Sequence, residues 1–363
     1  MKAISLLLAI VTYSCFISTS FASQTCISSQ IHLDKMLKED GNLQLKLMDA
    51  LDSRPSTSYW YKKKNKDFII FFKDWQCYVP HPDTLSKYNI IMADFVETKE
   101  GYYFMSIPFV RSWFISFLNE RKAFLNSPES AANIQEFIDD TKTKINEFIV
   151  PKSGFMNFNS FFQRKLKKNA RVVSMANNEK CLNSPVDGTF NKEDSILPNF
   201  LNTQVKLKTD TLSTKEVFNN SPYASKFVGG NVLNITLNYY NAHWLYSPVN
   251  GKIVDQNILA GLYNLESSNQ DLPQHKRGYL IVNTEKFGYV GIVAVGLQTV
   301  SEVNFLSSIN DDVKKGDVLG HFGYGGSTVI VFFESNLQMD FKIDLNKSGT
   351  SLEIGQILSC ISK

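Results

Sequence analysis

A serine preceded by two glycines is the residue of this chain whose setting best suits chemistry. Ser327 lies in the stretch Gly325-Gly326-Ser327-Thr328 and precedes an apolar, β-branched run that begins at Val329. Glycine permits backbone conformations that other residues avoid, and the following run favours a strand. The hydroxyl of a serine at the start of such a strand is placed to attack the carbonyl of the preceding residue. The motif predicts chain cleavage between Gly326 and Ser327, although four letters also fit a tight turn before a buried strand.

Short motifs that precede this serine strengthen the first interpretation. They are Phe158–Lys167 with Arg171, Ser184-Pro-Val-Asp-Gly188, Gly229-Gly230 with Leu237, His243–Gly251, and Val295-Gly296 with Val300. In this order, and together with the glycine–serine motif, they resemble the phosphatidylserine decarboxylase family of pyruvoyl-dependent enzymes. The resemblance covers residues 155 to 360, and co-linear blocks are far more specific than any one of them.

The resemblance implies an activity and a cofactor. The activity is conversion of phosphatidylserine to phosphatidylethanolamine through a Schiff base on a pyruvoyl group that derives from Ser327. Decarboxylation of an amino acid leaves a carbanion, for which the pyruvoyl carbonyl is an electron sink. Self-cleavage implies that the two fragments stay together as a heterodimer. Two alternatives remain open: a decarboxylase of a free, aromatic amino acid, and a non-catalytic relative that binds a ligand or partner.

The resemblance also assigns an Asp–His–Ser arrangement to activation of the serine. Asp187 matches the family aspartate, and His243 matches the first histidine of the family's histidine motif. Tyr246 stands where the family has its second histidine, the one assigned as the base. Tyrosine, with a reference pKa of about 10, is a poor base at neutral pH. Three alternatives could still supply a base for Ser327. His243 reaches Ser327 itself, His321 acts as the base, or a neighbouring Arg or Lys lowers the pKa of Tyr246.

The elements that must position these residues fall into two regions. Residues 27–150 are expected to be mostly helical, with apolar residues at helical spacing over 109–125 and a second helix that begins at Ser127 and ends before Pro151. This region resembles, more weakly, a helical domain found in relatives that include aromatic amino-acid decarboxylases.

Residues 151–363 read as short strands separated by turns, with buried strands expected over 280–284, 291–296 and 329–333. We therefore predict an α+β fold, with a helical N-terminal domain followed by a β-rich, barrel-like or sandwich decarboxylase domain.

The first 22 residues have the pattern of a signal peptide. Lys2 precedes a mostly apolar run, and Ser20 and Ala22 supply the small residues of a cleavage site. An uncleaved membrane anchor is the alternative. We expect an exported protein (periplasmic, secreted or in the secretory pathway), peripheral to a membrane if it contacts one.

Cysteine usage fits export. Four cysteines follow the predicted signal, and they allow two disulfides in three connectivities: Cys26, Cys77, Cys181 and Cys360. No Cys-x-x-Cys pair is present, so no metal site is expected.

The charge balance excludes one class of partner. A formal net charge of +3 on 363 residues is too small to indicate nucleic-acid binding. Basic clusters at 62–66 and 164–171 are interpreted as solvated surface, with attraction to anionic lipid head groups as the alternative. Homo-oligomerisation is left open.

Overall fold

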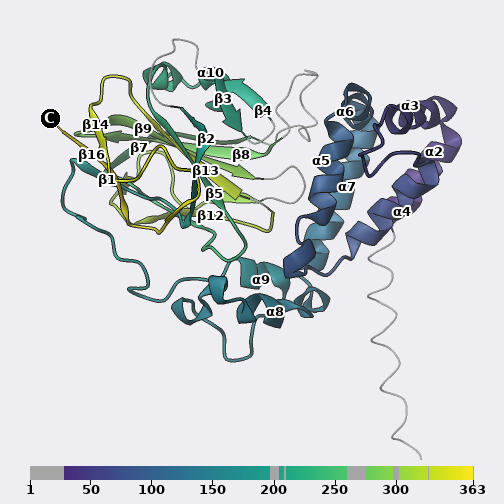
Figure 1. Cartoon of the computed structure of the whole chain (residues 1–363), viewed down its shortest axis with the longest axis horizontal. Helices are drawn as coiled ribbons and strands as arrows, with labels where there is room; N and C mark the ends of the chain where they lie inside the picture. Colours follow the sequence, from purple (N-terminus) through teal and green to yellow (C-terminus); the bar gives the residue numbers. More distant parts are fainter. Residues whose placement is uncertain are drawn as a thin grey trace, which may run out of the picture.

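The computed structural model describes residues 28–196, 204–207, 210–259, 275–296, 302–325 and 327–362. A group of helices and a β-rich region lie side by side, with short helices beneath and between them (Figure 1). The predicted signal peptide, Cys26 and Gly326 lie outside the described residues, so the structure leaves untested what the sequence predicts for them. None of the described helices is long and apolar enough to cross a membrane.

The helical region contains α2 (Ser28–Glu39), α3 (Gly41–Asp52), α4 (Asn65–Gln76), α5 (Lys87–Val96), α6 (Lys99–Ser106) and α7 (Pro108–Leu125). The helix predicted over 109–125 is confirmed as α7. Aromatic rings dominate the interior: Trp60, Phe68 and Phe72 are fully buried, and Phe72 meets Trp113 edge-on at 4.8 Å between ring centroids. Such edge-to-face pairs stabilise beyond their burial alone, so this region has a core of its own.

The single helix predicted after Ser127 is wrong. The chain instead forms η2 (Pro128–Ala131), α8 (Ile134–Asp139), η3 (Thr141–Thr143) and η4 (Ile145–Glu147), followed by α9 (Phe158–Phe162). Asp140 ends α8 in an extended conformation, and its carboxylate accepts a hydrogen bond from the Lys142 amide at 2.9 Å. Lys144 then adopts a left-handed conformation with φ of 46°. Aspartate competes in this way with helical backbone bonds, which breaks the helix despite its apolar periodicity.

The β-rich region begins at residue 181. Its strands are β1 (Cys181–Asn183), β2 (Gly188–Ile196), β3 (Gln204–Leu207), β4 (Asp210–Ser213), β5 (Val232–Leu237), β6 (Trp244–Tyr246), β7 (Gly251–Leu259), β8 (Arg277–Thr284), β9 (Gly288–Gly296), β10 (Val303–Phe305), β11 (Asp312–Val313), β12 (Val318–Phe322), β13 (Ser327–Phe333), β14 (Met339–Phe341), β15 (Thr350–Leu352) and β16 (Ile357–Ile361). The short α10 (Thr214–Val217) and η5 (Ala224–Phe227) interrupt them. The predicted α+β class is confirmed.

Strand β13 lies in the middle of an antiparallel sheet of eight strands, ordered β11-β7-β8-β9-β13-β5-β2-β15. Every residue of β13 is buried. Val329, Val331 and Phe333 pack into the cluster that includes α8 and α9, while Ile330 and Phe332 pack against α10 and η5 on the other face. A continuous apolar run is what a strand covered on both faces requires. The strands predicted over 280–284, 291–296 and 329–333 are confirmed as parts of β8, β9 and β13.

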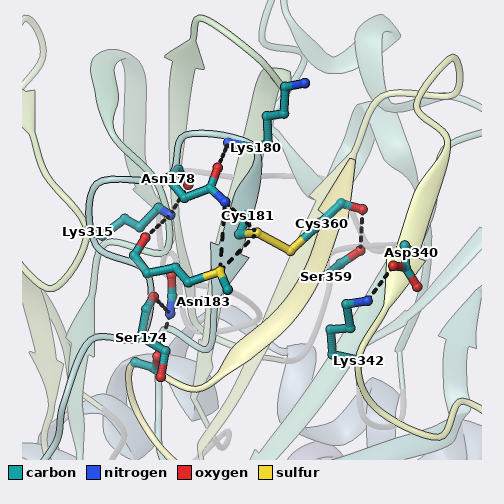
Figure 2. Close-up of a disulfide and its surroundings, with 12 residues drawn as sticks. Ser174, Asn178, Lys180, Cys181, Asn183, Lys315, Asp340, Lys342, Ser359 and Cys360 are labelled. Carbon is teal, nitrogen blue, oxygen red and sulfur yellow. Dashed lines mark hydrogen bonds and ion pairs between the residues drawn. A yellow bond between two sulfur atoms is a disulfide. The ribbon is translucent and has the colours of Figure 1, made fainter. Parts of the chain in front are cut away.

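A disulfide joins the first and the last strand of the β-rich region. Cys181 in β1 is bonded to Cys360 in β16, across an antiparallel pair of strands (Figure 2). Lys315 supports the turn before β1 by donating to the carbonyls of Met175 and Asn178 at 3.2 and 2.6 Å. This pairing is one of those that the sequence left open, and Cys77 is disulfide-bonded as well.

Candidate active site

Ser327 is the first residue of β13, between two strands that hold it on both sides. It pairs with Gly296 of β9 and Leu237 of β5, and its side chain is fully buried. Its hydroxyl donates to the carbonyl of Gly325 at 3.2 Å. Gly325 has a φ of 138°, a conformation that glycine adopts without strain. The hydroxyl is therefore directed at the backbone that precedes it, as attack on a preceding carbonyl requires.

His243 is a buried, neutral histidine that lines the same cavity as Gly325 and Leu237. Its ring stacks on Phe162 of α9 with centroids 3.7 Å apart, and its side chain is 1% exposed. Burial, and then the positive charge of Arg164, lower the pKa of His243 well below its usual value. Nδ1 has no hydrogen-bond partner among the described residues. The unpartnered nitrogen of a neutral imidazole is available to accept a hydrogen bond or a proton, although the lowered pKa makes it a weaker base than a free histidine.

Arg164 fixes the loop that carries His243. Its guanidinium is sandwiched between the rings of Phe148 and Phe161, at 4.4 and 4.5 Å from their centroids. One nitrogen, Nη2, donates to three successive carbonyls of the loop, at 2.8 to 3.3 Å: Tyr239, Tyr240 and Asn241. The sequence placed Arg164 in a solvated basic cluster. That interpretation is wrong, because the side chain is 2% exposed and held by aromatic rings and backbone.

A cavity of about 340 Å³ opens beside Ser327. The β-rich region and α9 contribute Phe162, Leu237, Asn238, Tyr239, His243, Tyr324 and Gly325 to its wall. The helical region contributes Pro82–Lys87, Asn89 and Ile90. The volume is typical of a site for a small molecule or a head group. The cavity thus brings the predicted His243 and the backbone next to the predicted nucleophile together.

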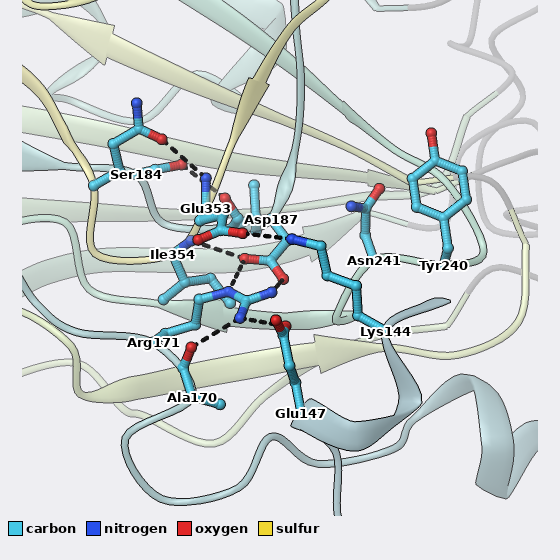
Figure 3. Close-up of polar contacts among 12 residues, drawn as sticks. Lys144, Glu147, Ala170, Arg171, Ser184, Asp187, Tyr240, Asn241, Glu353 and Ile354 are labelled. Carbon is cyan, nitrogen blue, oxygen red and sulfur yellow. Dashed lines mark hydrogen bonds and ion pairs between the residues drawn. The ribbon is translucent and has the colours of Figure 1, made fainter. Parts of the chain in front are cut away.

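Asp187 forms an ion pair with an arginine and, among the described residues, does not contact a histidine that could act as a base. Arg171 donates to both of its oxygens, with Nε 2.9 Å from Oδ1 and Nη2 2.7 Å from Oδ2 (Figure 3). The amide of Ile354 adds a third bond at 2.8 Å, and Glu147 binds the other side of Arg171 at 2.6 Å. Asp187 is buried and the Arg171 side chain is only 9% exposed, so each compensates the charge of the other. Arg171, like Arg164, was expected at the solvated surface, and that expectation is wrong.

Asp187 and Ser327 lie at the same end of the strands in the large sheet. Thr189 of β2 pairs with Thr236 of β5, and Thr236 pairs with Thr328 of β13. Strands in a sheet are spaced by about 4.8 Å, so β2 and β13 are about 10 Å apart. Asp187 lines a second, smaller cavity of about 70 Å³, which also includes Arg171 and Glu147. The aspartate is therefore near the serine without lining the same cavity.

Comparison with known proteins gives the family. The model of the phosphatidylserine decarboxylase family matches residues 158–359. The chain belongs to the phosphatidylserine decarboxylase family. It is 33% identical over 223 residues to the phosphatidylserine decarboxylase proenzyme of Clostridium novyi, covering 59% of this chain and 72% of that protein. The proenzyme of Fusobacterium nucleatum is 30% identical over 220 residues, covering 58% and 71%.

The chain is also similar to a eukaryotic protein. Phosphatidylserine decarboxylase proenzyme 3 of Schizosaccharomyces pombe is 31% identical over 234 residues, covering 63% of this chain and 24% of that protein. Membership of this decarboxylase family makes the chain a carboxy-lyase.

Tyr246 is the departure of this chain from the decarboxylase pattern, and it is a protonated phenol. It lies in β6 beside Asp187, packed with Phe148 and Ile354. Burial, and then the negative charge of Asp187, raise the pKa of Tyr246, and the opposing effect of Arg171 is smaller. A lowered pKa, one of the three alternatives expected from the sequence, is therefore wrong.

The structure separates His321 from the decarboxylase cavity. His321 lies in β12, paired with Trp244 of β6 and Asn304 of β10, and its ring packs on Trp244 at 5.0 Å between centroids. Burial lowers its pKa, and it is not among the residues that line the cavity. Of the two histidines considered as a substitute base, only His243 lies at the cavity beside Ser327.

Proposed function

We propose that the chain is a self-processing, pyruvoyl-dependent decarboxylase that converts phosphatidylserine to phosphatidylethanolamine. One observation carries the proposal: Ser327 starts a central strand, behind a glycine with φ of 138°, at a cavity that holds a buried neutral histidine. The names of the relatives, which are phosphatidylserine decarboxylase proenzymes, support both the reaction and a processing step.

The processing chemistry balances with this chain's own atoms and water. His243 accepts the hydroxyl proton, and Oγ of Ser327 attacks the carbonyl of residue 326, so the amide becomes an ester with a free amine. Loss of the Cα proton breaks the Cβ–O bond and releases the carboxylate of residue 326. The resulting dehydroalanine takes up water and loses ammonia, which leaves a ketone at the new N-terminus. Neither Tyr246 nor the Asp187–Arg171 ion pair supplies the base in this scheme. They form a largely buried polar cluster.

The residues around Ser327 also fit the group that processing would create. Ser327 itself is fully buried, while its strand partner Leu237 and the neighbouring Gly325 line the cavity. Gly325 leaves the backbone before Ser327 uncrowded by a side chain. Once formed, a pyruvoyl carbonyl supplies the electron sink for the carbanion left by decarboxylation. His243 is placed to hold or return a proton there, while Phe162, Leu237 and Tyr324 limit access of water.

We also propose that the enzyme acts outside the cytoplasm, against a membrane surface. The Cys181–Cys360 disulfide supports an oxidising compartment, in agreement with the signal predicted at the N-terminus. Phosphatidylserine is a component of bilayers, and the exposed Lys62, Lys64 and Lys66 offer charge complementary to anionic lipid. Binding to vesicles that weakens with added salt is the expected behaviour; indifference to lipid charge would contradict the membrane contact.

The test of function is turnover by matched serine variants. The purified protein is incubated with phosphatidylserine in phosphatidylcholine vesicles, and phosphatidylethanolamine is measured by mass spectrometry. We expect product from the wild type and from Ser335→Ala, whose side chain is exposed after β13, and none from Ser327→Ala. Equal product from the wild type and Ser327→Ala would show that the serine is not the source of the reactive group.

A further inference from the structure

One wall of the active-site cavity comes from outside the part of the chain that matches the family. The family model begins at residue 158, whereas residues Pro82–Lys87, Asn89 and Ile90 line the same cavity as His243 and Gly325. This wall consists of η1 (Pro82–Thr84) and the first turn of α5. A substrate that enters the cavity therefore touches residues that the shared decarboxylase region does not provide.

The wall is held against the catalytic region. The hydroxyl of Tyr324, three residues before Ser327, donates to the carbonyl of Leu85 at 3.2 Å. Burial raises the pKa of Tyr324 to about 12, so this donor keeps its proton. On the other side, Tyr78 and Thr84 share a hydrogen bond of 2.5 Å, and Tyr88 stacks on Trp75 at 5.8 Å between centroids. The wall thus has a fixed position relative to Ser327.

The first residues of α5 carry positive charge on this wall of the cavity. Ser86 is the N-cap, but its hydroxyl makes no capping bond, and Lys87 is the first helical residue. Both side chains are exposed and line the cavity. Within the described residues Lys87 forms no ion pair; its Nζ lies 5.3 Å from the ring centroid of Tyr88. The first N–H groups of a helix and its dipole favour an anion, and the ammonium adds a full charge.

The family-matched wall of the cavity marks where the reacting group must lie. It includes Gly325 and the buried His243, whose Nδ1 has no partner in the described residues. A serine-bearing substrate has its amine and carboxylate at one end and a phosphodiester at the other. With the amine at the Ser327 end, the phosphodiester extends toward the start of α5.

We propose that Lys87, together with the first turn of α5, binds the phosphodiester of the substrate and so selects phosphoester-linked serine over free serine. The proposal builds on the proposed function of the same site, and it assigns specificity to a segment outside the family-matched region. Asp83 also lines the cavity, but its side chain is 88% exposed and lies 4.0 Å from His81. Asp83 and Lys87 are both exposed, so solvent screens the charge of each.

The first arm of the test measures binding without turnover. Glycerophosphoserine and free serine are titrated calorimetrically into three full-length proteins. These are the Ser327→Ala variant and two double variants that combine Ser327→Ala with Lys87→Glu or with Lys99→Glu. Lys99 is a matched control, because it is exposed, begins α6, lies 5.7 Å from the ring of Tyr103, and does not line the cavity. Loss of a charge-assisted bond predicts a rise of about tenfold or more in the Kd of glycerophosphoserine for Lys87→Glu only.

The second arm measures turnover in the Ser327-containing protein. We expect KM for glycerophosphoserine to rise about tenfold in Lys87→Glu, with kcat within about twofold and little change for free serine. Diacyl phosphatidylserine in neutral vesicles should show the same loss. A loss confined to vesicles would make Lys87 a membrane contact and overturn the proposal.

The two arms separate the inference from the function on which it builds. An unchanged Kd for glycerophosphoserine in Lys87→Glu, or an equal change in Lys99→Glu, overturns the phosphodiester site whatever the enzyme does. A Kd that rises only in Lys87→Glu, in a protein whose wild type makes no product, supports the anion site while rejecting the decarboxylase function.

Discussion

Arg171 and Asp187 form a buried ion pair in which both charges depend on each other. The pair is bidentate, and the two side chains are 9% and 3% exposed. Removal of one partner leaves the other charge buried and uncompensated, which is far more costly than loss of a surface pair. The aspartate of the family motif is therefore a structural anchor in this chain, whatever part it plays in processing.

Arg171→Leu should lower the free energy of unfolding by about 3–5 kcal/mol, measured by urea denaturation followed by fluorescence. The control is Lys144→Leu, since Lys144 and Glu353 form an ion pair at 2.9 Å in which both side chains are about half exposed. That change should cost about 1 kcal/mol or less. Equal losses in the two variants would mean that Asp187 does not depend on Arg171.

His243 links stability to pH because the folded protein holds it neutral. Its pKa is lowered by burial, so between its folded value and the unfolded value of about 6.5 only the unfolded chain binds the proton. The stabilisation is present above pH 6.5 and is lost as the pH falls, by up to about 1.4 kcal/mol per pH unit for one group.

His243→Gln should therefore reduce the loss of stability between pH 6.5 and 5, measured from thermal or urea unfolding at each pH. The control is His32→Gln, because His32 is exposed on α2. Identical pH profiles for the wild type and His243→Gln would contradict a buried, neutral His243. The same variant should process slowly, since it removes the proposed base.

The disulfide between β1 and β16 links the two sides of the proposed cleavage point. Cys181 precedes residue 326 and Cys360 follows it, so processing would leave the two fragments covalently joined. Hydrogen bonds of β13 to β9 and β5 on both sides would also keep the small fragment in the sheet.

We expect denaturing electrophoresis of the mature protein to give one band without reductant and two bands with it. In Cys360→Ser the fragments should separate without reductant. Fragments that separate from the wild type in denaturant alone would show that this disulfide does not form in the protein.

Several elements could be predicted because their signals are local. The periodicity over 109–125 gave α7, and continuous apolar runs gave β8, β9 and β13. The break at Asp140 depends on a side chain competing for a backbone amide, which apolar periodicity does not record. The wall of residues 82–90 escaped prediction because it meets Tyr324 only through the tertiary fold.

Some residues of the site could likewise be predicted from local motifs, and others could not. Ser327, Asp187 and His243 were found from motifs, and His243 proved to lie at the cavity beside the serine. Arg164 and Arg171 were missed because a run of basic residues looks the same in sequence whether it faces water or the core. For Arg164 a signal was present in the aromatic residues of the same region, since Phe161 and Phe148 are the rings that cover it.

At the scale of the whole molecule, two separately packed regions close around one cavity. Each has its own apolar cluster, and contacts such as Lys122–Glu302 at 2.6 Å and Tyr324–Leu85 join them beside the site. The family-matched region brings the serine and the histidine, while the helical region brings the charged wall. Chemistry and selectivity are thus divided between the two regions.

In the proposed reaction, Ser327 becomes the N-terminus of a separate fragment that carries a ketone. The most direct measurement is the intact mass of the purified full-length protein, denatured and reduced. We predict a fragment of residues 327–363 that is lighter by one ammonia than its sequence requires and that reacts with hydrazine. A single uncut chain, unreactive toward hydrazine, would contradict self-processing and the decarboxylase function that depends on it.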